Sequence, residues 1–455
     1  MRKYFSLILI LVGFTCSLFC HADTSNDVSE FKLDNGLTVL VKEDHRAPVV
    51  MSLLMYHIGA SYEPNGITGI SHALEHMMFK GTKQFPGSEY TRLVTKNGGS
   101  LNAFTGTDYT GYHVQISAEK LPLILKLEAD RMSNLILAEK DFNKEIEVVK
   151  EERHLRTENV PDALAYEQFQ AAAFLGIPYH NPIVGWPSDL DNMKLSDLQA
   201  WYNSWYLPNN ASLVVVGDVD PKEVLALAKK YFGGIKSGTT PVVKPFKSVP
   251  TYGVRSVNVE RPAQVPLLFR GFNVPNATGA QEAWEPYVLQ VLSGILSAGE
   301  SSRFVKNLIR SKKIATQVSA DYGLYYRLPY LFTIQGVPAK DTTIRELKIA
   351  ILDEIKHLQT KPVSINELER VKALSIADDV YEKDSISHQA IKYGVLQSIG
   401  MPWQESENYR KQIAAVTPEQ VQAVAKKYFL PNQMTIAVLK PQQSEPKAND
   451  QTGAQ

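Results

Sequence analysis

The chain has 455 residues, which exceeds one ordinary domain and suits two large ones. Hydrophobic residues make up 44% and charged residues 21%, and the formal net charge of +0 gives no electrostatic case for nucleic acid or an anionic membrane as a partner. Both cysteines lie in the first 20 residues, which excludes a disulfide framework and a thiolate nucleophile in the rest of the chain.

The first 22 residues have the pattern of a secretory signal peptide. Arg2 and Lys3 precede an apolar run, and Ala22 stands at a cleavage point. A membrane anchor is the alternative, although the run is short for a span and is interrupted by Gly13. Removal of residues 1–22 leaves 46 basic against 48 acidic residues, a net charge of −2. We expect export across the inner membrane, and a periplasmic location if the organism is Gram-negative.

The mature chain begins with alternating strand and helix signals. Residues 31–44 predict a hairpin, because Asp34-Asn35-Gly36 separates two alternating apolar runs. Further along the chain, residues 49–59 predict a buried strand and a helix holds 71–82, while residues 98–117, rich in Gly, Thr and aromatics, predict strands joined by tight turns. Helical periodicity predicts helices within 118–136 and 138–159.

Two parts of the chain resemble each other. "YLPNNASLVVV" (206–216) and "FLPNQMTIAVL" (429–439) each follow a predicted helix, which opens near Ser196 or Thr417, and each ends in an apolar strand. These matches suggest duplication. The alternative is that the same common turn occurs twice by chance.

We therefore predict an α+β fold of two homologous domains, each an antiparallel-rich sheet with helices packed on one face. Their expected ranges are 23–232 and 254–440, joined by a Gly- and Pro-rich linker at 233–253 and followed by a disordered tail at 441–455.

"SHALEHMMFKGT" (71–82) carries the strongest chemical signal. His72 and His76 are four residues apart, so on a helix both imidazoles face one point, and Glu75 borders the same point. The order His-x-x-Glu-His is the inverted-zincin signature, in which two histidines bind zinc and the glutamate acts on water. The alternative is a surface helix with two unrelated histidines.

A catalytic zinc needs a third protein ligand and an open position for water. The stretch "NKEIEVVKEERHLR" (143–156) offers carboxylates on another predicted helix. Glu145 and Glu152 are seven residues apart and share a helix face, with Val148 and Val149 between them expected to point into the core. From spacing alone either glutamate is a candidate ligand, and the charged run also fits a solvated helix face.

Longer stretches resemble the pitrilysin-like peptidases, and most closely the branch of the mitochondrial processing peptidases and their bacterial relatives. The resemblance rests on "HRAPVVMSLLMYHIGASYEPNGITGISHALEHMMFKGT", "GGSLNAFTGTDYTGYH" and "EIEVVKEERHL", and it extends to "NPIVGWPSDLDNM" and "WYLPNNASLVVVGD". It implies two homologous α+β domains that enclose a peptide chamber and one zinc ion per chain. It implies Glu75 as the catalytic base, His72, His76 and Glu152 as ligands, and Glu145 in an auxiliary role that orients the ligands.

The resemblance also implies substrate-binding residues. Asn102-Ala103-Phe104-Thr105 matches the strand that lines the active site and pairs with an extended peptide, although an ordinary edge strand is the alternative. Arg310 matches a substrate-binding arginine. The family places a tyrosine seven residues later, but this chain has Gln317 there, or Thr316 with a one-residue gap.

The missing tyrosine leads to a prediction about partners. We expect a heterodimer in which a second pitrilysin-like chain supplies the Arg/Tyr pair. The alternative is a homodimer in which another tyrosine of this chain takes over, with Tyr322, Tyr325 and Tyr326 as the candidates. The expected function is zinc-dependent endopeptidase action on unfolded peptides or small proteins outside the cytoplasm, and the rival is a non-catalytic assembly or peptide-binding subunit.

Overall fold

The computed structural model describes residues 28–246 and 252–442 of the chain. The predicted signal peptide, part of the predicted linker and nearly all of the predicted tail therefore lie outside the described residues. We call residues 28–246 the N-terminal half and residues 252–442 the C-terminal half. Among the described residues, no helix has the length and apolar character needed to cross a membrane.

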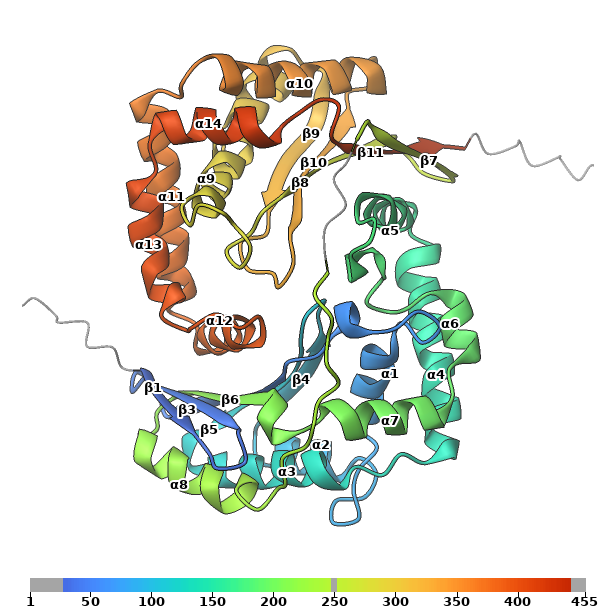
Figure 1. The fold of residues 1–455 in the computed structure, drawn as a ribbon, viewed down its shortest axis with the longest axis vertical. Helices are drawn as coiled ribbons and strands as arrows, with labels where there is room; N and C mark the ends of the chain where they lie inside the picture. The colour runs from blue at the N-terminus through green and yellow to red at the C-terminus, as the bar shows by residue number, and fades with distance from the viewer. Residues whose placement is uncertain (1–27, 247–251, 443–455) are drawn as a thin grey trace, which may run out of the picture.

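Each half contains one sheet and a set of helices (Figure 1). The N-terminal half contains β1 (Val28–Lys32), β2 (Thr38–Glu43), β3 (Val49–Tyr56), α1 (Ile70–Met77), α2 (Glu89–Lys96), β4 (Ser100–Thr105), β5 (Thr110–Ser117), α3 (Leu121–Asn134), α4 (Glu139–Arg153), η3 (His154–Glu158), α5 (Pro161–Ala173), α6 (Pro187–Asn192), α7 (Leu195–Trp205), β6 (Ala211–Gly217) and α8 (Pro221–Phe232). The C-terminal half contains β7 (Arg255–Arg261), β8 (Leu267–Val274), α9 (Glu285–Ser297), η6 (Phe304–Ser311), β9 (Ala315–Tyr322), β10 (Tyr330–Pro338), α10 (Ile344–Thr360), α11 (Ile365–Glu382), α12 (Ile386–Ser398), α13 (Glu405–Ala415), α14 (Pro418–Tyr428) and β11 (Thr435–Pro441).

The two sheets share one topology. The strand orders are β1-β2-β6-β3-β5-β4 and β7-β11-β8-β10-β9. In each half the last strand lies between two earlier strands. It pairs in parallel with the first of them, β6 with β2 and β11 with β7. It pairs antiparallel with the second, β6 with β3 and β11 with β8. The two Leu-Pro-Asn segments lead into β6 and β11. This matching order agrees with duplication, and β1 is the additional strand of the N-terminal sheet.

Local signals place the early elements as expected. The predicted hairpin forms between β1 and β2, with Gly36 at φ 89° in its turn. The Asn35 side-chain amide donates to the carbonyl of Phe232 at 2.8 Å, which holds the turn against the end of α8. Thr417 caps α14 through a hydrogen bond from Gln420 N, whereas Ser196 lies inside α7, whose N-cap is Lys194.

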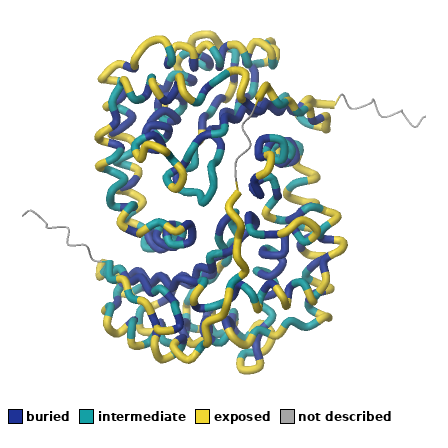
Figure 2. Tube along the Cα trace, in the orientation of Figure 1, coloured by how far each residue is buried: buried dark blue, intermediate teal, exposed yellow. Residues whose placement is uncertain are grey.

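Helices of the same half cover one face of each sheet, as predicted. The core of the N-terminal half joins buried residues of α1, α3, α7 and α8 to its sheet, and the core of the C-terminal half joins residues of α9, α10 and α14 to its own sheet. Figure 2 shows these buried segments between exposed outer turns. The sequence patterns did not indicate what covers the second face of each sheet.

Each sheet's second face is covered by a helix from the opposite half. Helix α5 of the N-terminal half packs on β7, β8 and β11, where Phe169 stacks on Phe269 with ring centroids 5.7 Å apart. Helix α12 of the C-terminal half packs on β3 and β6, as Figure 1 shows. Burial of apolar surface stabilises the folded state by about 25 cal/mol for each Å² removed from water. The exchanged helices therefore join the two halves through shared apolar cores.

The connection between the halves has little regular structure. Helix α8 ends at Phe232 and β7 begins at Arg255, and no helix or strand occurs in the described part of the interval. This stretch coincides with the predicted linker. Chain order suggested that each half has its own hydrophobic core. Because α5 and α12 each pack on the sheet of the opposite half, two of the cores contain residues of both halves.

Candidate metal centre

Helix α1 carries the His-x-x-Glu-His motif and is fixed at its N-terminus by Glu63. The backbone N–H groups of Gly69 and Ser71 donate to the two Glu63 carboxyl oxygens at 2.6 and 2.8 Å. These bonds satisfy two of the N–H groups that a helix start leaves unpaired. Burial raises the pKa of Glu63 to about 7. Gly69 adopts φ 86°, and a Cβ there would lie 2.5 Å from the carbonyl oxygen of Val184, so a side chain is excluded at this turn.

The apolar face of α1 fixes the direction of the motif. Its buried hydrophobic residues face the core of the N-terminal half, namely Ile70, Ala73, Leu74 and Met77. His72, Glu75 and His76 are on the other side of the helix and are partly exposed. The helix therefore presents both imidazoles and the carboxylate together, as the spacing predicted.

Helix α4 packs against α1 and brings Glu152 to both imidazoles. Glu152 Oε2 lies 3.8 Å from His72 Nε2 and 3.4 Å from His76 Nε2. The three ligand atoms lie within 4.8 Å of one another. Val149 is buried as expected, but Val148 is 48% exposed, so the prediction that both valines point into the core was wrong. Of these two adjacent positions, only that of Val149 lies on the buried face of α4.

This donor set fits zinc. Zinc bonds of about 2.0–2.1 Å in a tetrahedron place neighbouring ligand atoms about 3.3 Å apart, close to the separations from Glu152 Oε2 to the two imidazoles. Burial, with the neighbouring His76 as a second cause, lowers the pKa of His72 to about 4. The His72 imidazole is therefore neutral at pH 7, which is the form that binds a metal. Two imidazoles and one carboxylate are a common catalytic zinc set.

Glu145 contacts the other side of one ligand. Its Oε2 atom lies 3.4 Å from His76 Nδ1, and its Oε1 atom accepts a hydrogen bond from Lys80 Nζ at 2.5 Å. A carboxylate at this nitrogen favours the His76 tautomer whose Nε2 is free to bind a metal. The structure thus separates the two glutamates that spacing left equivalent: Glu152 faces both imidazoles from the metal side, and Glu145 lies behind one of them.

Three further residues hold this site. The sequence analysis gave Lys80 and Arg156 no role and named Thr105 only as part of the strand that lines the site. Lys80 holds Glu145, as described above. Arg156 Nη1 lies 2.6 Å from Glu152 Oε1, the oxygen that does not face the imidazoles. Thr105 Oγ1 donates to Glu75 Oε2 at 2.5 Å. The i to i+4 spacing of Glu152 and Arg156 was a usable signal, whereas the contacts of Lys80 and Thr105 join separate elements.

Glu75 is placed as a general base would be. Burial raises its pKa from the ordinary value, while the hydrogen bond from Thr105 opposes that rise. A carboxylate whose pKa moves toward the working pH is better suited to accept and return a proton. The Thr105 bond also orients the carboxylate, because Thr105 belongs to β4 and Glu75 to α1.

Strand β4 is the edge strand of the N-terminal sheet and borders the site. Asn102, Ala103 and Phe104 line a cavity of about 910 Å³ together with the metal-ligand candidates. Within the described residues β4 pairs only with β5, so its other edge has backbone groups available for an extended peptide. The cavity wall also includes Tyr326 and Tyr330 of the C-terminal half.

Arg310 lies elsewhere in this chain. It belongs to η6, its side chain is 60% exposed and it pairs with Glu300, and it does not line the cavity that holds the two histidines. Of the three alternative tyrosines, only Tyr326 lines that cavity. Tyr322 donates to the carbonyl of Pro275 at 2.7 Å, and the Tyr325 hydroxyl is buried.

Comparisons with known proteins identify the family of the chain. Residues 38–185 match the family model described as Insulinase (Peptidase family M16), and residues 192–375 match the Peptidase M16 inactive domain. The first match contains His72, His76 and Glu152, whereas residues 192–375 contain no His-x-x-Glu-His sequence.

Individual relatives extend the match to nearly the full length. The chain is 30% identical over 445 residues to a protein of Helicobacter pylori named zinc protease PqqE, covering 96% of this chain and 97% of that one. It is 24% identical to the uncharacterized zinc protease YmxG of Bacillus subtilis, covering 88% and 96% of the two chains.

Solved structures show the same fold. The crystal structure of a protease from Helicobacter pylori has a TM-score of 0.85 and 28% identity, covering 91% of this chain and 99% of that one. The first half of the periplasmic protease PqqL from Escherichia coli has a TM-score of 0.75 at 19% identity, with 92% of each chain covered. From the near full-length match to the Helicobacter pylori zinc protease, we conclude that the chain belongs to peptidase family M16, a family of zinc metallopeptidases.

Proposed function

We propose that this chain is an active zinc-dependent endopeptidase that hydrolyses peptide bonds in unfolded peptides or small proteins. The observation that supports this most directly is the position of Glu75. Its carboxylate belongs to the same helix as His72 and His76 and is hydrogen-bonded to Thr105 of the edge strand β4. A base, a metal donor set and a strand edge thus border one cavity.

The proposed reaction is metal-assisted hydrolysis. His72, His76 and Glu152 would hold a zinc ion, which when bound would supply Lewis acidity toward a water molecule and the scissile carbonyl. Glu75 accepts a proton from the attacking water and delivers it to the nitrogen of the leaving amine, so the C–N bond breaks and a carboxylate and an amine form. Thr105 holds the Glu75 carboxylate in place through this exchange.

The proposed substrate is an extended chain. Backbone N–H and C=O groups at the free edge of β4 suit a peptide that adds as a further strand, with side chains entering the cavity alternately. A folded protein has few segments free to pair in this way. The pattern of residues 1–22 supports export, so we propose action outside the cytoplasm.

One experiment separates an active peptidase from a non-catalytic subunit. The purified mature protein should contain about one zinc ion and should cleave unstructured fluorogenic peptides. Glu75→Gln should keep the zinc and lose turnover, because Glu75 is a base rather than a ligand, whereas His72→Ala should lose both. Zinc-loaded wild-type protein that cleaves none of a diverse peptide set would favour the non-catalytic alternative.

We further propose a heterodimer, in which a second pitrilysin-like chain supplies an arginine and a tyrosine to the chamber. The support is the exposed position of Arg310 and the glutamine at position 317. Loss of one oxyanion donor costs about 10²–10³ in rate, so the isolated chain is expected to be weak. A homodimer that uses its own tyrosine is the alternative.

The solution mass of the pure chain and its activity at several concentrations test this proposal. Weak hydrolysis that rises when a second, zinc-free family member is added would support the heterodimer. Full activity from a homogeneous preparation of this chain would refute it.

A further inference from the structure

We propose that Tyr326 and Tyr330 of the C-terminal half form an aromatic subsite that selects a large aromatic or aliphatic side chain of the peptide bound at the metal centre. This inference rests on the proposed peptidase function. It concerns side-chain selection, and it assigns Tyr326 a role other than that of an oxyanion donor.

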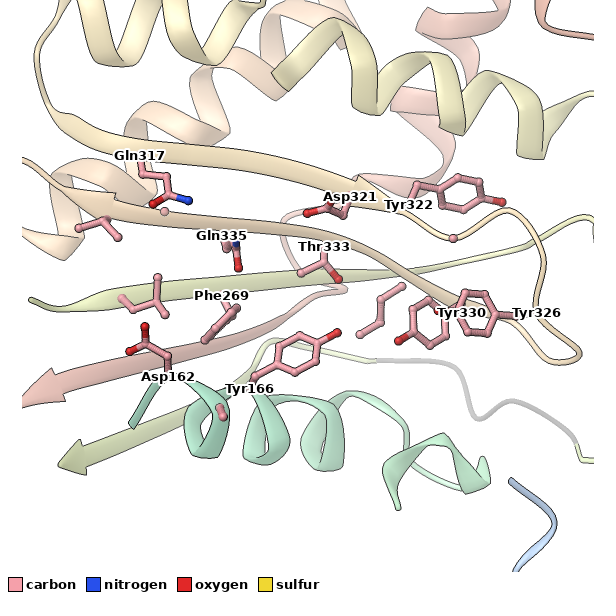
Figure 3. A pocket seen from close by; sticks show the side chains of 16 residues that line it. Asp162, Tyr166, Phe269, Gln317, Asp321, Tyr322, Tyr326, Tyr330, Thr333 and Gln335 are labelled. Atoms are coloured by element: carbon pink, nitrogen blue, oxygen red, sulfur yellow. The ribbon is translucent and has the colours of Figure 1, made fainter. Parts of the chain in front are cut away.

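The two rings stack face to face where two cavities meet. Their centroids are 3.9 Å apart and their planes are inclined by 5°. Both residues line the cavity that contains His72, Glu75 and His76, and both also line a second cavity of about 600 Å³. Figure 3 shows Tyr326 and Tyr330 at one end of the second cavity, with Tyr166 of α5 near them.

Tyr166 also lines both cavities, so the aromatic surface is shared by the two halves. Beyond these rings the wall of the second cavity combines the apolar side chains of Leu267, Phe269, Leu331 and Val337 with the polar side chains of Gln317, Asp321, Thr333 and Gln335. The stacked tyrosines, together with Tyr166, are aromatic residues that line both this cavity and the cavity of the metal centre. Tyrosine faces give a large contact area at low cost in side-chain entropy, which suits them to bind planar or apolar groups.

The loop that carries Tyr326 is fixed to the N-terminal half by Asp108. This buried carboxylate lies in the turn between β4 and β5, so it is adjacent to the strand that borders the metal centre. Asp108 Oδ2 accepts hydrogen bonds from the backbone N–H of Arg327 at 3.0 Å and from the Tyr179 hydroxyl at 2.6 Å. Oδ1 accepts from Ser61 Oγ at 2.7 Å and lies 3.3 Å from Arg327 Nε.

Two further hydrogen bonds hold the same loop, the first from the C-terminal half and the second from the N-terminal half. Thr278 Oγ1 donates to the carbonyl of Tyr326 at 2.8 Å, and the Tyr179 hydroxyl accepts from the backbone N–H of Leu328 at 2.9 Å. The backbone on both sides of Arg327 is therefore fixed before substrate arrives. A surface held in this way loses little further freedom on binding, which favours selectivity.

The absence of a side chain at Gly323 leaves room for the Tyr326 ring. A Cβ at Gly323 would lie 2.1 Å from Cε2 of Tyr326, so any larger residue must displace the ring. The Gly323→Ala variant therefore perturbs the subsite while it leaves both tyrosines in the chain.

The test uses fluorogenic octapeptides in pairs that carry either Phe or Ala at one position, with that position scanned along the peptide. We expect wild-type protein to prefer Phe at one position, and Tyr326→Ala to reduce the Phe-to-Ala ratio of kcat/KM there roughly tenfold. Tyr326→Phe should keep the preference because it keeps the ring. Tyr381→Ala, at a residue of α11 that is 73% exposed, is the control and should keep the wild-type ratio.

Gly323→Ala should lose the preference in the same direction as Tyr326→Ala, with zinc content unchanged in both. An unchanged ratio at every position in Tyr326→Ala would overturn the subsite. If wild-type protein cleaves no peptide, the peptidase proposal fails. Binding of the same labelled pairs to the zinc-loaded Glu75→Gln protein then decides the subsite separately: a Phe preference that Tyr326→Ala removes would support it, and equal binding of Phe and Ala peptides would refute it.

Discussion

The contact between Asp108 and Arg327 gives the most specific stability prediction. Asp108→Asn keeps the size and shape of the side chain but removes its charge and turns one acceptor into a donor. Each Asp108 oxygen accepts two hydrogen bonds. The NH2 group of the new asparagine must therefore face two hydrogen-bond donors, whichever way its side chain is oriented.

The magnitude follows from these contacts. A hydrogen bond to a charged group contributes about 1.5–3 kcal/mol, so two lost bonds cost about 3–6 kcal/mol. Arg327 also loses its counter-charge. Because the Arg327 side chain is 18% exposed, water compensates for part of this loss. Breaking a buried pair by removing one partner costs about 3–5 kcal/mol. We therefore expect the free energy of unfolding to fall by about 3–5 kcal/mol.

A second Asp–Arg pair between the same two halves supplies a matched control. Arg46 Nη1 lies 3.0 Å from Asp384 Oδ1, with side chains 56% and 69% exposed. An exposed pair contributes about 0–1 kcal/mol, so Asp384→Asn should change the free energy of unfolding by no more than this.

Urea unfolding of zinc-loaded protein, followed by circular dichroism, measures both variants. We expect one transition, because α5 and α12 join the two halves through common cores. Asp108→Asn and Arg327→Met should be strongly non-additive in the double variant, since the two residues share one network. A loss below about 1 kcal/mol for Asp108→Asn, or equal losses for the buried and exposed pairs, would refute the reasoning.

Three further predictions concern the metal, the pH and the exchanged helix. Glu152→Ala should abolish zinc binding while Glu145→Ala weakens it by roughly 10–100-fold; competition with a chelator measures both, and full zinc loss from Glu145→Ala alone would reverse the two roles. Burial lowers the pKa of His57 to about 4, so the unfolded chain takes up a proton below about pH 6.5 that the folded chain does not. Stability should fall between pH 6.5 and 4, by about 1–2 kcal/mol from this partly exposed residue, and urea titrations of His57→Asn should lack that component. Phe169→Ala should cost about 3–5 kcal/mol in a single unfolding transition, and separate transitions for the two halves would contradict the coupling through α5.

The sequence by itself determined the parts of the molecule that depend on neighbours along the chain. Asp34-Asn35-Gly36 specified a turn, and alternation specified β1 and β2. The spacing of His72, Glu75 and His76 specified a common helix face because an α-helix repeats every 3.6 residues. The repeated Leu-Pro-Asn segments predicted two related halves, and the sheet orders agree.

The tertiary structure decided the rest of the site. Periodicity placed Glu145 and Glu152 on one face, but only the packing of α4 on α1 determined which carboxylate faces both imidazoles. The same periodicity could not distinguish Val148 from Val149, because the width of a buried helix face depends on the partner helix.

The exchange of α5 and α12 and the position of Tyr326 were also decided by tertiary structure. An amphipathic pattern shows that a helix has an apolar face, but it does not identify the sheet that this face covers. Arg327 meets Ser61 across 266 positions of sequence. Such contacts form only when both sheets are in place, because their free energy depends on burial and geometry that no local spacing encodes.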